Sequence, residues 1–144
     1  MTDSMSLACA LRVALVLWHI NKMIYLKTDE EVELMRLSND LLGRTLAEVA
    51  KVIRPGVTTA QLDKVAYEFI CDHGGIPSCL GYEGYPATLC TSVNEQVVHG
   101  IPSDKVILKD GDIVSVDTVV KLNGFCADSA YTFPVGEVAP ETLQ

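Results

Sequence analysis

Two aspartates, Asp117 and Asp128, flank an Asn-Gly turn cue at Asn123-Gly124. From Ile113 to Val120, a side with Ile, Ser, Asp and Val alternates with a side of Val, Val, Thr and Val, which predicts a β-strand. Phe125 to Phe133 is expected to be the return strand of a hairpin. A four-residue loop over 121–124 places Asp117 directly opposite Asp128, whereas a two-residue Asn-Gly turn makes them diagonal neighbours. In either register the two carboxylates share one face of the hairpin.

Two carboxylates in such positions repel each other and destabilise a hairpin unless positive charge lies between them. Carboxylate oxygens suit divalent ions such as Mg²⁺ or Mn²⁺, and two-metal hydrolases hold their ions about 3.5–4 Å apart. The pair therefore predicts a site for one or two divalent metal ions. The alternative is that both aspartates face solvent, because this pattern by itself is not specific.

Two helices are expected before the hairpin. Capping boxes at Thr28/Glu31 and Thr58/Gln61 predict their starts, and Pro55-Gly56 and Gly74-Gly75 predict their ends. His73, at the end of the second helix, is interpreted as structural. Short β-type segments follow Gly75. The order predicts an α+β fold with two helices packed on an antiparallel sheet.

The composition is that of a globular protein: 49% of the 144 residues are hydrophobic and 21% are charged. A formal net charge of −8 argues against direct nucleic-acid binding, which needs a basic face. The five cysteines are odd in number and scattered, which disfavours a disulfide framework and favours a reducing cytoplasm. Each cysteine is expected to be a small buried apolar residue.

Residues 1–22 differ from the domain predicted over residues 23–144. Leu7 to Ile20 is an apolar run interrupted by Arg12 and His19, and it is short for a membrane span. No Lys or Arg precedes it and no A-x-A site follows it, as a signal peptide would require. Translation from Met23, or a dispensable extension, is favoured over an export signal.

Four segments resemble type I methionine aminopeptidases, which are metallopeptidases of the pita-bread fold. These segments are Cys79-Leu-Gly-Tyr-Glu-Gly-Tyr-Pro86, Cys90-Thr-Ser-Val-Asn-Glu-Gln-Val-Val-His-Gly-Ile-Pro102, Leu108-Lys-Asp-Gly-Asp-Ile-Val-Ser-Val-Asp117 and Asn123-Gly-Phe-Cys-Ala-Asp128-Ser. The resemblance runs from about Met23 to the end of the chain and implies the N-terminal half of the pita-bread fold. The chain departs from the family pattern at Cys126-Ala127, where the family often has His-Gly.

The resemblance implies a role for seven residues. Asp117 and Asp128 match metal ligands, the second of them bridging two divalent ions, for which Co, Mn, Fe and Zn are candidates. His99 matches the histidine that contacts the substrate and stabilises the reacting carbonyl. Cys79, Tyr82, Tyr85 and Cys90 match the walls of the methionine pocket, as thioether recognition favours. The alternatives are an ordinary loop histidine and generic packing of the tyrosines.

The implied activity is metal-dependent removal of the initiator methionine from new polypeptides. Its partners are the N-terminal methionine of nascent peptides and, as a further candidate, the ribosome, with no membrane partner. The family's remaining ligands, one histidine and two glutamates, belong to the second half of the fold. No histidine follows Asp128 here, and Glu137 and Glu141 lie close to the end of the hairpin, not in a strand that could close the site. The 144 residues alone are therefore expected to be inactive, to bind metal weakly and to expose an apolar face. The alternatives are a non-catalytic half-domain or binding module, and an X-Pro dipeptidase relative, which the His99-Gly-Ile-Pro102 block disfavours.

Overall fold

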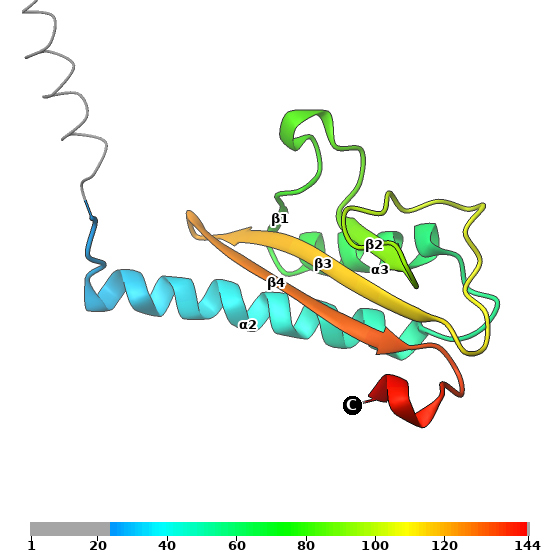
Figure 1. The fold of residues 1–144 in the computed structure, drawn as a ribbon. Helices are drawn as coiled ribbons and strands as arrows, with labels where there is room; N and C mark the ends of the chain where they lie inside the picture. The colour runs from blue at the N-terminus through cyan, green and yellow to red at the C-terminus, as the bar shows by residue number, and fades with distance from the viewer. Residues whose placement is uncertain (1–23, 144) are drawn as a thin grey trace, which may run out of the picture.

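The computed structural model describes residues 24–143 of the chain. Its elements are α2 (Asp29–Val52), α3 (Thr59–Asp72), β1 (Ile76–Pro77), η1 (Tyr82–Gly84), β2 (Leu89–Val93), β3 (Ile113–Leu122), β4 (Phe125–Pro134) and η2 (Pro140–Leu143). The two long helices pack on an antiparallel sheet, with α2 running along the β3–β4 hairpin (Figure 1). The expected arrangement of two helices on an antiparallel sheet is confirmed. The predicted boundary at residues 1–22 lies outside the described residues.

Both helices begin at the predicted capping boxes. The Thr28 hydroxyl accepts from the Glu31 N–H while the Glu31 carboxylate accepts from the Thr28 N–H, and Thr58 and Gln61 repeat the arrangement. Each box satisfies N–H groups that the first helical turn leaves without partners. His73 is the C-cap of α3, where its ring contacts Phe69, so the structural interpretation agrees with its position.

Strand β3 is the centre of the sheet. It pairs antiparallel with β4 over its whole length, with β2 from Val114 to Thr118, and with the short β1 near its end. Its residues alternate as predicted: Val114, Val116, Thr118 and Val120 are buried against the helices, and the residues between them lie on the other face. This alternation places Asp117 on the face away from the helices.

The connection between β3 and β4 is the two-residue turn Asn123-Gly124, since Leu122 pairs with Phe125. Both turn residues have positive φ, 52° and 87°, as a type I′ hairpin turn requires. The four-residue loop is therefore wrong, and Asp117 does not face Asp128. Instead Asp117 pairs with Ala130 and Asp128 pairs with Val119, which makes the aspartates diagonal neighbours on one face.

The buried core lies between the helices and the sheet in two clusters. The larger joins α2 and α3 to β2, β3 and Val135, and the smaller joins Leu41, Leu42 and Ile70 to Val120 and Ala127. The Ser38 hydroxyl links α2 to the hairpin end through the carbonyls of Leu122 and Phe125, at 3.0 and 3.1 Å. The sheet is thus held rigidly from the helix side.

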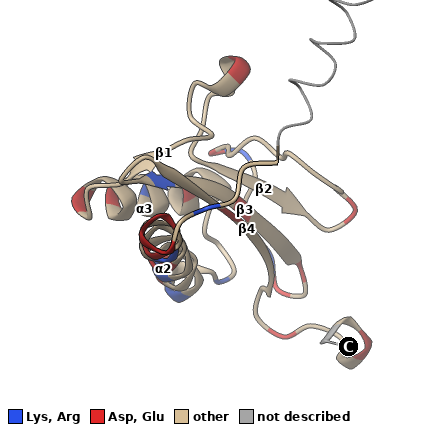
Figure 2. Ribbon diagram, turned by 90° about the vertical axis from the view of Figure 1, so that its left-hand side faces the viewer, with Lys and Arg blue, Asp and Glu red and all other residues tan. Residues whose placement is uncertain are grey.

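Charge and thiols are distributed over the molecule. Acidic residues occur on the helices, in loops and in η1 (Figure 2). The expectation of buried cysteines is wrong for Cys71 and Cys126, which are exposed, whereas Cys90 is buried and Cys79 half-buried, all as free thiols. Cys9 lies outside the described residues.

Among residues 24–143, no helix combines the length and apolar character needed to cross a bilayer.

Asp63 connects α3 to the beginning of β2. One of its carboxylate oxygens, Oδ1, accepts from the backbone N–H groups of Thr88 and Leu89 at 2.8 and 2.7 Å. Burial raises the pKa of Asp63 above its usual value of 3.8, although these two N–H groups oppose the change. The contact therefore fixes the start of β2 at the cost of a partly buried charge.

We expect Asp63→Asn to keep both hydrogen bonds, because the amide oxygen can take the place of Oδ1. A raised pKa in the folded state means that the carboxyl favours folding most when protonated, and this advantage is lost as the pH rises through the folded pKa. The stability of the native protein relative to Asp63→Asn should therefore fall as the pH rises from the usual carboxyl pKa of 3.8 towards neutrality. Urea unfolding across this range measures the difference, and a relative gain by the native protein would contradict it.

Asp63→Ala is the matched variant that removes the acceptor. It leaves the Thr88 and Leu89 N–H groups without a partner, at a cost of about 1–3 kcal/mol for each buried group. Its loss of stability should exceed that of Asp63→Asn at every pH.

Candidate active site

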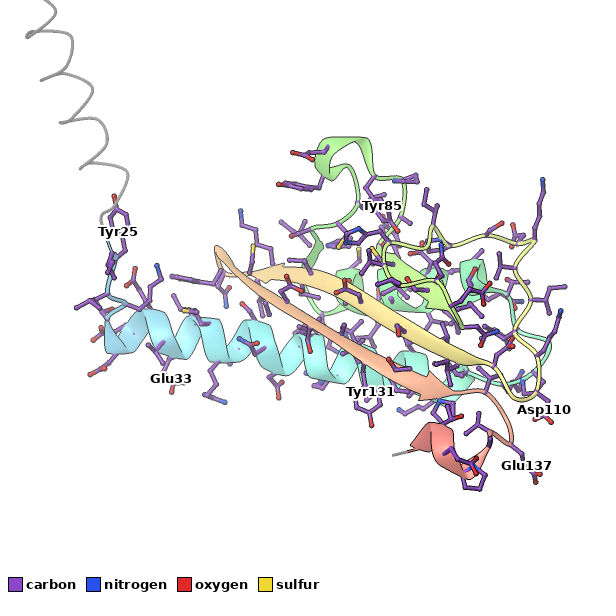
Figure 3. The ribbon with its side chains drawn as sticks, in the orientation of Figure 1. Tyr25, Glu33, Tyr85, Asp110, Tyr131 and Glu137 are labelled. Atoms are coloured by element: carbon purple, nitrogen blue, oxygen red, sulfur yellow. The ribbon has the colours of Figure 1, made fainter. Side chains whose placement is uncertain are left out.

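One cleft of about 560 Å³ on the face of the sheet away from the helices brings all seven predicted site residues together. Its lining consists of Cys79, Tyr82, Glu83, Gly84, Tyr85, Pro86, Cys90, His99, Ile101, Asp117, Val119 and Asp128. These residues come from β2, β3, β4, the segment around η1 and the loop that follows β2. Figure 3 shows Tyr85 on this side of the sheet, opposite to the side where Tyr131 lies.

The two aspartates occupy the β3–β4 wall of the cleft. Asp117 is half-buried in the middle of β3 and Asp128 is exposed on β4. Their diagonal relation follows from the two-residue turn, and diagonal neighbours on one face lie about 7–8 Å apart at the backbone. Carboxylates on such a diagonal can both reach a group placed between them.

The electrostatic environment of Asp117 is unfavourable for its charge. Burial raises the pKa of Asp117, repulsion from Asp128 raises it further, and His99 opposes both effects. The arrangement is thus a pair of like charges whose repulsion a cation in the cleft would relieve.

His99 lies in the loop between β2 and β3, at a left-handed backbone position with φ of 55°. The next residue, Gly100, fixes this loop against β2: its N–H donates to the Ser92 hydroxyl at 3.2 Å and its carbonyl accepts from the Thr91 N–H at 2.7 Å. A Cβ on Gly100 would overlap the Thr91 carbonyl oxygen. Only glycine therefore permits the close approach that directs His99 into the cleft.

The apolar end of the cleft is built from two tyrosines and two thiols. The Tyr85 hydroxyl donates to the carbonyls of Leu89 and Gly100, at 3.0 and 3.3 Å, and so connects this wall to the His99 loop. Burial is the main cause that raises the pKa of Cys79, Cys90 and Tyr85, so all three stay protonated at neutral pH. Neutral sulfur and aromatic groups form a soft apolar surface.

Several residues of the site were not predicted. Glu83, Pro86, Ile101 and Val119 also line the cleft, and Asp63 and Gly100 support it from behind. Val119 shares the alternating face of Asp117, which could have identified it. No local pattern reveals that Asp63 meets β2, because the contact joins residues 25 positions apart.

Within residues 24–143, no three His, Cys, Asp or Glu side chains form a group that could hold a metal ion. The predicted metal ligands Asp117 and Asp128 therefore belong to no such group among the described residues.

We expect Gly100→Ala to displace the His99 loop, because the added methyl group has no space against Thr91. The ¹H–¹³C resonances of the His99 ring should shift, and the free energy of unfolding should fall by about 1–3 kcal/mol. Gly43→Ala is the control, since a Cβ at Gly43 meets nothing within 4 Å. An unchanged His99 ring signal in Gly100→Ala would refute the positioning role of Gly100.

Comparison with known proteins agrees with this geometry. Residues 33–144 match metallopeptidase family M24. The methionine aminopeptidase of Clostridium acetobutylicum is 50% identical over 122 residues, which cover 85% of this chain and 49% of that protein. The chain spans about half the length of the curated relatives it matches.

Solved structures show the same fold. The methionine aminopeptidase from Rickettsia prowazekii superposes with a TM-score of 0.81 at 40% identity, covering 84% of this chain and 48% of that one. An Xaa-Pro dipeptidase from Bacillus anthracis, at 21% identity and a TM-score of 0.66, covers 81% of this chain and 31% of its own and shares the fold alone. The described residues form half of a pita-bread fold. Since the family match extends over residues 33–144, the chain belongs to metallopeptidase family M24.

Proposed function

We propose that this chain supplies one wall of the active site of a methionine aminopeptidase, which removes the initiator methionine from new polypeptides. The observation that carries the proposal is the single cleft in which two carboxylates, a histidine and a thiol–aromatic pocket meet. A hydrolase for an N-terminal methionine needs these components side by side. The relatives named methionine aminopeptidase support this substrate.

Asp117 and Asp128 would hold the divalent ions that a metallopeptidase uses. The donor set fits such ions, because two hard oxygen ligands share one face, and burial followed by repulsion from Asp128 raises the pKa of Asp117. Ions bound there would supply Lewis acidity that activates water and polarises the scissile carbonyl. Co, Mn, Fe and Zn are the candidate ions.

The chain's own residues would bind and orient the substrate. The methionine side chain would enter between Cys79, Cys90 and the two tyrosines, where sulfur–aromatic contacts contribute about 0.3–1.5 kcal/mol each. His99, held by Gly100, would donate a hydrogen bond to the carbonyl oxygen as negative charge develops on it. The residues after methionine would continue into a second recess of about 320 Å³, which shares Cys90, His99 and Asp117 with the cleft.

We place the enzyme in the cytoplasm, where the thiols of Cys79 and Cys90 remain reduced. New chains carry their initiator methionine as they leave the ribosome, which is therefore the expected site of encounter. An X-Pro dipeptidase function is less favoured, because similarity to those enzymes is limited to about 20% identity. A non-catalytic role would not account for the carboxylates, the histidine and the thiol–aromatic pocket that meet in this cleft.

We expect the purified 144-residue chain to leave a Met-Ala-Ser peptide intact, because its described residues hold two metal ligands and no third. It should still bind the peptide in the thiol–aromatic pocket. Tyr82→Ala should weaken this binding by up to about tenfold, which corresponds to about 1.4 kcal/mol. NMR titration of the peptide against the labelled chain measures both dissociation constants.

Tyr67→Ala is the matched control, because Tyr67 is also an exposed tyrosine but lies on α3 outside the cleft. Equal losses in the two variants would contradict the assignment of the pocket. Stoichiometric cleavage of the peptide by the chain would contradict the expected inactivity.

A further inference from the structure

Three hydroxyl-bearing residues form a row across the open face of the sheet, next to Asp117. Ser92 on β2 pairs with Ser115 on β3, and Ser115 pairs with Thr132 on β4, so the three lie side by side in register. All three line the second recess of about 320 Å³, which also contains Asp117 and His99. Residues two apart on a strand share a face, so the hydroxyl row is one step along this face from Asp117.

Ser115 and Thr132 form a hydroxyl pair that can serve a ligand. Their side-chain oxygens lie 2.7 Å apart in a hydrogen bond. This bond uses only one of the two O–H groups and leaves lone pairs on both oxygens. The pair can therefore both donate to and accept from a hydroxyl group of a bound molecule. Ser92 differs, because its hydroxyl already accepts from the Gly100 N–H at 3.2 Å.

Another part of the same recess is apolar. Val97 and Val98, in the loop just before His99, line it and are 87% and 61% exposed. Ala130, the neighbour of Asp117 on β4, contributes only a methyl group and leaves the floor of the recess open. A small side chain that carries both a methyl and a hydroxyl group would find a contact for each of them here.

The row lies where the residue after methionine would be placed. Val119 lines the cleft with the methionine pocket and Ser115 lines the recess, and each is two residues from Asp117 along β3. Two residues of a strand span about 7 Å. From a scissile carbonyl beside Asp117, the side chain of the next residue together with a hydrogen bond of about 2.8 Å can cover this distance.

We infer that the recess recognises a hydroxyl-bearing residue directly after the methionine, with threonine as the best fit. Ser115 and Thr132 would hold its hydroxyl group, while Val97 and Val98 would contact its methyl group. The inference rests on the proposed aminopeptidase function and specifies the substrate class of the same cleft as chains that begin with Met-Thr. Valine is the matched comparison, because it has the shape of threonine with a methyl group in place of the hydroxyl. A site built to bond a hydroxyl rejects the analogue that lacks it.

Two matched peptides test the inference on the ¹⁵N-labelled 144-residue chain. Met-Thr-Ala-amide and Met-Val-Ala-amide differ only in that hydroxyl group. NMR titration should give a dissociation constant about two- to tenfold lower for the threonine peptide, which is the range expected for one net hydrogen bond. Equal dissociation constants for the two peptides would overturn the inference.

Thr132→Val should abolish most of this preference by weakening the threonine peptide alone. Valine suits a strand as well as threonine does, so β4 should stay intact. Ser115→Ala removes the other hydroxyl of the pair and should have the same effect. Ser129→Ala is the control, because Ser129 is an exposed hydroxyl on β4 that pairs with Thr118 and so lies on the other face of the sheet. A preference that persists in both Thr132→Val and Ser115→Ala would contradict the role of the pair.

Tyr82→Ala separates a failure of this inference from a failure of the proposed function. It shortens a wall of the methionine pocket and should weaken both peptides by the same factor. Peptides that bind equally to the native chain and are both weakened by Tyr82→Ala would refute the threonine preference and leave the proposed function standing. Peptides that are indifferent to Tyr82→Ala would refute the pocket and the inference together.

Discussion

The placement of Asp117 and Asp128 on one face of the β3–β4 hairpin is the constraint on which the candidate site depends. The two-residue turn fixes both carboxylates on the open face of the β3–β4 hairpin, where burial and then repulsion from Asp128 raise the pKa of Asp117. Strands usually avoid aspartate at such positions. The arrangement disfavours the charged form of Asp117 in the hairpin without a ligand, and the proposed cations would relieve that cost.

The remaining parts of the fold keep this face open and its walls fixed. The helices cover only the other face of the sheet, and their capping boxes and the Ser38 contacts hold that layer in register. On the cleft side, Asp63 fixes the start of β2 and Gly100 fixes the His99 loop. The Tyr85 hydroxyl contacts both regions. Asp63 and Gly100, which lie outside the cleft, thereby fix two of its walls.

Local patterns predicted much of this arrangement. Capping boxes, the alternation along β3 and the Asn-Gly cue depend on neighbouring residues, and each marks its element correctly. The register was ambiguous because turns of two and four residues both fit Lys121 to Gly124. The supports from Asp63 and Gly100, and the exposure of Cys71 and Cys126, depend on contacts between distant segments that periodicity does not encode. Motif resemblance identified the seven residues that the fold gathers in one cleft, and their roles remain predictions.

Metal binding at the hairpin tests this account most directly. Mn²⁺ titrated into the ¹⁵N-labelled chain should first broaden the amide resonances around Asp117 and Asp128, through paramagnetic relaxation. Asp128→Asn should abolish this selective broadening, while Asp104→Asn, a change at an exposed loop residue outside the cleft, should leave it intact. Broadening that is diffuse over the acidic surface, or that persists equally in Asp128→Asn, would contradict the claim that the two aspartates form part of a metal site.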